Sequence, residues 1–169
     1  MDPDEPPGDF DVALANRQSA HPVDEPRLLT AVRSILTDAA GLERATVSVA
    51  VVDDATIHEL NRRFLNHDWP TDVLSFVLDE TDGSLEGEII LSADTAAASA
   101  PEFGWSAADE QLLYVIHGTL HLVGYDDQTD VAAAEMRAAE ARYLERLGVR
   151  FPLLPEGERT PCDGGTSAT

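Results

Sequence analysis

The chain has 169 residues, 43% of them apolar and 25% charged, which is typical of one soluble globular domain. Its net charge is −21 and all eleven basic residues are arginines, which on charge alone disfavours nucleic acid as a partner. No apolar run approaches the length of a membrane span, and the acidic, proline-rich first residues are unlike a secretory leader. These features predict a cytoplasmic protein with no membrane partner.

The chain divides into a folded part and two flanking segments. Residues 1–25 are rich in Pro, Asp and Ala without sustained periodicity, and we expect them to form a flexible acidic lead-in. Residues 26–154 are expected to form a single domain, and residues 155–169 have the composition of a disordered tail. The only cysteine, Cys162, lies in that tail and can form no internal disulfide.

Helical spacing of apolar residues and alternating β-branched residues predict the following elements. In chain order they are a helix over 26–40, a strand over 46–52, a helix over 54–65, strands over 73–78 and 88–91, a helix over 94–99, a helix that starts at Ser106, and a helix over 131–147. The apolar residues of the helix over 54–65 are expected to face the core: Ile57, Leu60, Phe64 and Leu65. This order predicts an α+β domain in which helices cover a small mixed sheet.

The helix that starts at Ser106 carries a candidate metal site. His117 and His121 are four residues apart, so they lie on one face of that helix. Gly124 can end the helix with a positive φ and return Asp127 over the same face. A histidine pair on an apolar helix is more often structural, but two imidazoles and a carboxylate also make a catalytic metal site with an open position. On this interpretation the domain over 26–154 is a metallohydrolase.

The spacing His-x-x-x-His-x-x-Gly-x-x-Asp also matches the zinc-binding turn of the metzincin proteases. Zinc proteases of this kind place a glutamate directly after the first histidine as the general base. Here that position is Gly118, which has no side chain. A zincin-type peptidase therefore stays an alternative that lacks its base.

A second candidate region precedes the strand over 73–78. Arg62 and Arg63 are the only adjacent basic pair in the chain, so they are candidates for binding phosphate. Solvated arginines on a helix face are an equally good interpretation. Asp72, after Pro70 and Thr71, is best explained by a turn.

Together these regions resemble the YbeY family of bacterial metal-dependent endoribonucleases. The matching stretches are LNRRFLNHDWPTDVLSF (60–76), GEIILSAD (87–94), HGTLHLVGYDD (117–127) and EMRAAEARYLERLG (135–148), within residues 45–148. The resemblance implies a zincin-like α+β fold with one Zn²⁺ per chain, held on a helix and the turn after it. It also implies cleavage of single-stranded RNA, maturation of the 3′ end of 16S rRNA and ribosome quality control, with the small ribosomal subunit as a partner.

The resemblance assigns two metal ligands to His117 and His121. The family's third ligand is normally a histidine, and here that position is Asp127. An arginine that the family usually carries before the PTDVLSF stretch aligns with Leu65. These two departures leave open a non-catalytic ribosome-assembly factor with a vestigial metal site. The nucleophile, water or the RNA 2′-hydroxyl, also stays open.

Overall fold

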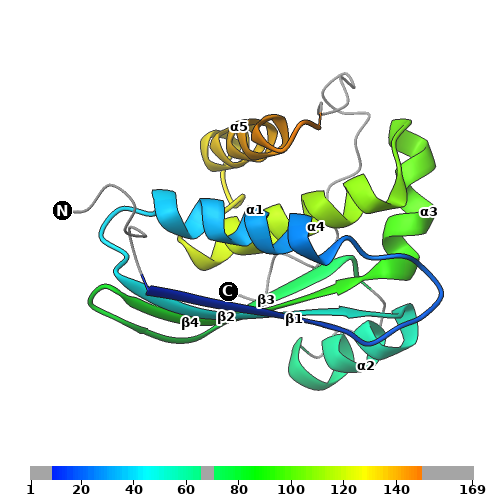
Figure 1. The fold of residues 1–169 in the computed structure, drawn as a ribbon, viewed down its shortest axis with the longest axis horizontal. Coiled ribbons are helices and arrows are strands. Elements are labelled where there is room, and N and C mark those ends of the chain that lie inside the picture. Colours follow the sequence, from blue (N-terminus) through cyan, green and yellow to red (C-terminus); the bar gives the residue numbers. More distant parts are fainter. Residues whose placement is uncertain (1–8, 66–70, 150–169) are drawn as a thin grey trace.

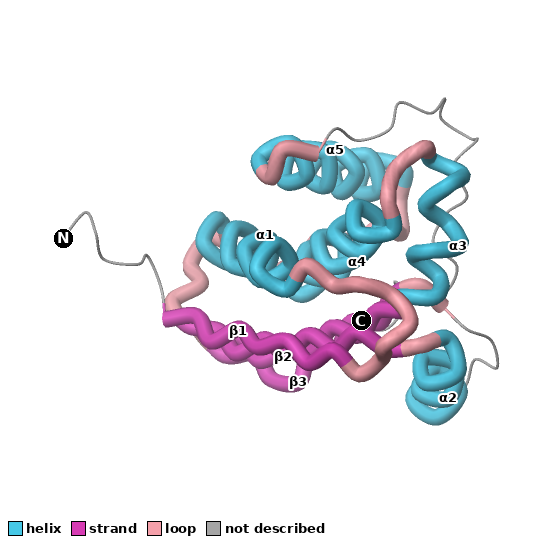
Figure 2. Tube along the Cα trace, turned by 45° about the vertical axis from the view of Figure 1, so that its right-hand side comes forward, coloured by secondary structure: helices cyan, strands magenta, loops and turns pink. Residues whose placement is uncertain are grey.

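The computed structural model describes residues 9–65 and 71–149, which form one sheet with helices on both faces. The elements in chain order are β1 (Asp9–Asn16), α1 (Glu25–Asp38), β2 (Arg44–Val52), α2 (Asp54–Leu65), β3 (Val73–Thr81), β4 (Ser84–Ser92), α3 (Ala93–Phe103), α4 (Ala107–Leu122) and α5 (Asp130–Arg146). Helices α1, α4 and α5 lie on one side of the sheet and α2 lies on the other (Figures 1 and 2). Each predicted helix and strand is present.

The sheet has the order β1-β2-β4-β3. Strands β1, β2 and β4 run parallel, and β3 runs antiparallel to β4. A tight turn at Gly83, where φ is 72°, joins β3 to β4. The sheet is therefore mixed and covered by helices, which confirms the predicted α+β class.

Strand β1 corrects the expected lead-in over residues 1–25. Residues 9–16 instead pair in register with residues 44–51 of β2. Phe10, Val12 and Leu14 alternate toward the core, with Val12 buried. The strand was missed because this alternation spans only a few residues, and its pairing partner β2 lies distant in sequence. Residues 1–8 and the predicted tail over 155–169 lie outside the described residues.

Helix α4 is the centre of the main core. Its side chains are buried on all sides from Glu110 to Leu122, since it contacts α1, α3, α5, β3 and β4. Leu112, Ile116 and Leu120 are fully buried. A helix that is apolar all round must be enclosed by other elements, and here the enclosure places the candidate metal residues in the interior.

A smaller apolar cluster lies under α2 on the other face of the sheet. Its buried members are Val52, Ile57, Leu74 and Ile90. Leu60 and Leu65 pack against it as predicted, but Phe64 does not belong to the core, because 61% of its surface is exposed. The prediction for Phe64 was wrong because helical spacing defines a face of α2, but not how far the sheet extends beneath it.

A polar contact ties α1 to α5. Asp38 accepts hydrogen bonds from Tyr143 (2.8 Å) and Arg146 (2.6 Å). The hydrogen bond from Arg146 lowers the pKa of Asp38, so its contribution to stability is present above the unfolded-state pKa of about 3.9 and is lost as the pH falls further.

We expect Asp38→Asn to lower the free energy of unfolding at pH 7 by about 1 kcal/mol or less, because the ion pair is largely exposed. Urea unfolding of both proteins at pH 7 and pH 3 tests this. The difference should shrink at pH 3, and an equal difference at both pH values would show that the Asp38 charge is not involved.

Candidate metal centre

Helix α4 presents the two predicted histidines on one face. Ser106 caps the helix, since its Oγ accepts a hydrogen bond from Asp109 N at 3.1 Å. One turn apart near the other end, His117 and His121 are only 8% and 5% exposed. Their Nε2 atoms face each other at 3.2 Å. Two imidazoles thus converge on one point in a nearly closed interior.

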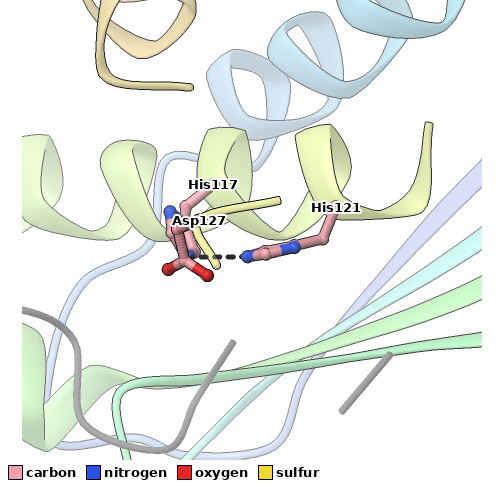
Figure 3. A group of neighbouring side chains, drawn as sticks. All are labelled: His117, His121 and Asp127. Atoms are coloured by element: carbon pink, nitrogen blue, oxygen red, sulfur yellow. Dashed lines mark hydrogen bonds between the residues drawn. The ribbon is translucent and has the colours of Figure 1, made fainter. Parts of the chain in front are cut away.

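The turn after α4 returns Asp127 to the same point (Figure 3). Gly124 has a φ of 109°, which favours glycine, and Tyr125 N donates to Leu120 O at 3.0 Å across the turn. One ligand atom each of His117, His121 and Asp127 lies within 4.8 Å of the other two. The three residues that the sequence analysis singled out are therefore neighbours, with Asp127 on the exposed side.

Glu140 of α5 is a further residue of the centre, which the sequence analysis missed. Its Oε2 lies 2.8 Å from His117 Nδ1, and both side chains are buried. Because a carboxylate only accepts hydrogen bonds, Nδ1 carries the proton and Nε2 presents its lone pair toward His121. A signal existed, since Glu140 lies on the buried stripe of α5 that Met136 and Tyr143 define, where an unpaired charge is costly.

The geometry fits a single divalent ion. Two nitrogen ligands at the usual Zn–N distance on a tetrahedral ion are separated by about 3.3 Å, close to the 3.2 Å found here. Two imidazoles, which are borderline ligands, with one carboxylate form a set that suits zinc and other late first-row metals. In such sites a carboxylate commonly accepts a hydrogen bond from the ring nitrogen that does not bind the metal. Glu140 has this position relative to His117.

The pKa values of the two histidines are shifted in opposite directions. Burial lowers the pKa of His117, but the hydrogen bond and charge of Glu140, together with the charges of Asp72 and Asp127, raise it overall. Burial and the neighbouring His117 lower the pKa of His121. The lowered pKa leaves a ring nitrogen of His121 available to a cation, whereas a cation competes with a proton for Nε2 of His117.

Close packing against the sheet explains why residue 118 is a glycine. A Cβ at this position would lie 3.0 Å from Ile89 Cγ2 and 3.4 Å from Val73 Cγ2. The absent side chain therefore lets α4 approach strands β3 and β4 closely. Position 118, which in zinc proteases holds the general base, therefore faces the sheet here.

The other candidate residues are not members of the candidate ligand group, although the charge of Asp72 helps to raise the pKa of His117. Arg62 and Arg63 are exposed on α2 and both contact Glu59, with Arg62 Nη2 at 2.7 Å from its Oε2. Asp72 accepts a hydrogen bond from Val73 N at 2.7 Å at the start of β3, as a residue of a turn would. Pro70 lies outside the described residues.

Comparison with known proteins decides the family. The model of the family described as Endoribonuclease YbeY matches residues 13–148. The chain belongs to the YbeY endoribonuclease family. It is similar to the Endoribonuclease YbeY of Rhodopirellula baltica, with 46% identity over 72% of this chain and 63% of that protein. That of Moorella thermoacetica is 40% identical over 83% of this chain and 99% of its own length.

A similar arrangement is also found among solved structures. The solution structure of TM1509 from Thermotoga maritima has a TM-score of 0.57 and 30% sequence identity, and the match covers 82% of this chain and 88% of that one. The family match begins at residue 13, inside β1, so the first strand belongs at least in part to the shared YbeY domain.

We expect Glu140→Gln to weaken metal binding by about 10-fold, because the amide keeps the hydrogen bond to His117 but removes the charge behind it. Competition with a chromogenic chelator measures the affinity. Glu135→Gln changes an exposed carboxylate on the same helix and serves as the control. Equal affinities for the two variants would mean that Glu140 does not tune the site.

Proposed function

We propose that this chain is a metal-dependent endoribonuclease that cleaves single-stranded RNA, using one Zn²⁺ held by His117, His121 and Asp127. The observation that carries the proposal is the convergence of the two Nε2 atoms at 3.2 Å beside Asp127, with Glu140 behind His117. Membership of the YbeY family directs this metal chemistry to RNA. Within the described ranges, no helix has the length and hydropathy that crossing a membrane requires.

The protein residues supply a preorganised site. When bound, the ion supplies Lewis-acid stabilisation of charge on the scissile phosphate and lowers the pKa of bound water. Glu140 fixes the orientation of the His117 ring, and burial keeps the His121 ring neutral. Asp127 lies at the exposed side of the centre, where a substrate from solvent reaches it.

We further propose that the RNA is the precursor of 16S rRNA and that the enzyme works in the cytoplasm on the small ribosomal subunit, in 3′-end maturation and quality control. The support is the set of sequence stretches shared with the YbeY family. The net charge of −21 opposes attraction of RNA to the whole surface. RNA is therefore recognised at a local surface or delivered by the ribosomal subunit.

Incubation of zinc-loaded protein with matched single-stranded and duplex RNA, including the 3′ region of precursor 16S rRNA, tests the proposal. Only single-stranded RNA should be cleaved, and His121→Ala should abolish cleavage. A 2′,3′-cyclic phosphate product would identify the 2′-hydroxyl as nucleophile. Intact RNA from a protein that still co-sediments with small subunits would instead identify an assembly factor without catalysis.

The peptidase alternative is tested in the same assay with a peptide library. Gly118 leaves no carboxylate beside His117, and its position faces the sheet. We therefore expect no peptide cleavage.

A further inference from the structure

Phe64 and Phe76 form an aromatic pair on the surface, which we call the aromatic platform. Their ring centroids are 6.2 Å apart with an interplanar angle of 67°, an edge-to-face arrangement. Phe64 is 61% exposed, while Phe76 is half-buried against the cluster under α2. Phe76 thus holds the pair in place, and Phe64 presents apolar ring surface to solvent.

The platform lies across one strand from the metal centre. Phe76 is followed in β3 by Val77, and successive side chains of a strand point to opposite faces. Val77 lines a cavity of about 470 Å³ that His121, Tyr125 and Asp126 also line. β3 is the last strand of the sheet in the described part of the chain. An extended chain that crosses this edge therefore passes from the platform to the cavity beside His121.

The backbone of β3 is irregular at this crossing. The pairing with β4 shifts between Val77 and Asp79. Such a bulge redirects side chains, and here Leu78 is 57% exposed. The edge strand thus carries a further exposed apolar side chain two residues after Phe76.

The surface beside the platform is less acidic than the rest of the protein. Arg62 and Arg63 precede Phe64, and their side chains are 55% and 64% exposed. Glu59 contacts both, and Glu88 of β4 pairs with Phe76, so the four charged side chains sum to zero in a chain of net charge −21. This surface therefore repels phosphate less than the protein as a whole does.

We propose that the aromatic platform stacks a base of the single-stranded RNA substrate while the adjacent arginines face its backbone. The inference rests on the proposed endoribonuclease function. Stacking on an exposed aromatic ring is tolerant of base identity, and the combination of aromatic rings with basic side chains is how proteins hold unpaired strands. The platform would position the strand so that a neighbouring nucleotide reaches the metal centre across β3.

Binding of a fluorescently labelled single-stranded RNA by zinc-loaded protein tests the platform, measured before cleavage proceeds, with a gel to show that the RNA is still intact when the signal is read. We expect Phe64→Ala to raise Kd by at least about fivefold, the smaller end of the loss on removing one stacked base. Phe64→Trp should restore binding. Val131→Ala removes another exposed apolar side chain, at 69% exposure on α5, and should leave Kd unchanged.

An oligonucleotide with abasic positions separates stacking from charge. Wild type and Phe64→Ala should bind the abasic oligonucleotide with equal affinity. If Phe64→Ala weakened binding of the abasic oligonucleotide as much as that of the intact one, stacking would be ruled out. An unchanged Kd and KM for Phe64→Ala, in a protein that cleaves RNA, would overturn the platform and leave the proposed function intact. Phe64-dependent binding without cleavage would support the platform and contradict the proposed activity.

Sedimentation distinguishes RNA binding from self-association. If wild type is oligomeric and Phe64→Ala is monomeric, the Phe64 ring contacts a second copy of the chain and the proposal is wrong. Thermal unfolding of each variant checks that it is folded. We expect Phe64→Ala to stay folded, because the Phe64 side chain is largely exposed.

Discussion

His121→Ala will bind no stoichiometric zinc and will not cleave RNA. The substitution removes one of the two Nε2 atoms that face each other at 3.2 Å, and a two-ligand site does not compete with buffer and chelators. Metal analysis of the purified protein and a cleavage assay measure the two losses. His58→Ala, on α2, is the control and should keep both metal and activity.

Asp127→Ala distinguishes a third ligand from a nearby carboxylate. If Asp127 binds the ion, this variant retains the two buried imidazoles but holds zinc much more weakly than wild type. Zinc retained at wild-type affinity would show that Asp127 is not a ligand, and that another group completes the site.

Asp127→His restores the residue that the YbeY resemblance implies at this position. It removes a negative ligand, which should make the metal a stronger Lewis acid and its bound water more acidic. We therefore expect the pH–rate profile to move to lower pH while zinc stays stoichiometric. An unchanged profile would show that the charge of Asp127 does not set the acidity of the reacting group.

Gly118→Glu will destabilise the protein strongly and will not create a peptidase. A Cβ alone would lie 3.0 Å from Ile89 Cγ2, and the rest of a glutamate would have to enter the packed contact between α4 and the sheet. Overpacking combined with burial of an unpaired charge should cost at least about 3 kcal/mol of unfolding free energy. Urea unfolding measures the loss.

Gly118→Ala is the matched comparison. Alanine improves helix propensity by up to about 1 kcal/mol, and its Cβ is crowded but has no charge, so the net change should be small. If Gly118→Glu unfolds at the same urea concentration as Gly118→Ala, there is room for a glutamate side chain between α4 and β4, and the close contact with Ile89 does not restrict this position. Peptide cleavage by Gly118→Glu would show that this position does face substrate.

Local pattern was enough to locate most of the elements and three residues of the candidate metal centre. The spacing of His117 and His121 is a property of one helix, and the positive φ at Gly124 is a property of one turn. Patterns within one element can be interpreted from sequence, because the backbone geometry of a helix or turn alone determines which of its side chains are neighbours. The adjacent arginines are equally visible in the sequence, and Glu59, which contacts both, lies one helical turn before them.

The residues that sequence reasoning missed or misplaced all depend on contacts between distant segments. Strand β1 depends on pairing with β2, and the exposure of Phe64 depends on where the sheet ends beneath α2. Glu140 reaches His117 from another helix, 23 residues away in the chain. A charged residue on a buried stripe indicates that a partner exists, but only the packing of α5 against α4 identifies it.

The sequence by itself determined a domain with a helix-borne histidine pair, a glycine turn and an acidic residue after it, because these are local features of 117–127. Only the tertiary structure decided that the pair is oriented by Glu140, that Gly118 is a packing contact and that the aromatic platform lies one strand from the centre. The physical reason is that burial and hydrogen-bond partners follow from long-range packing, which no spacing along the chain encodes.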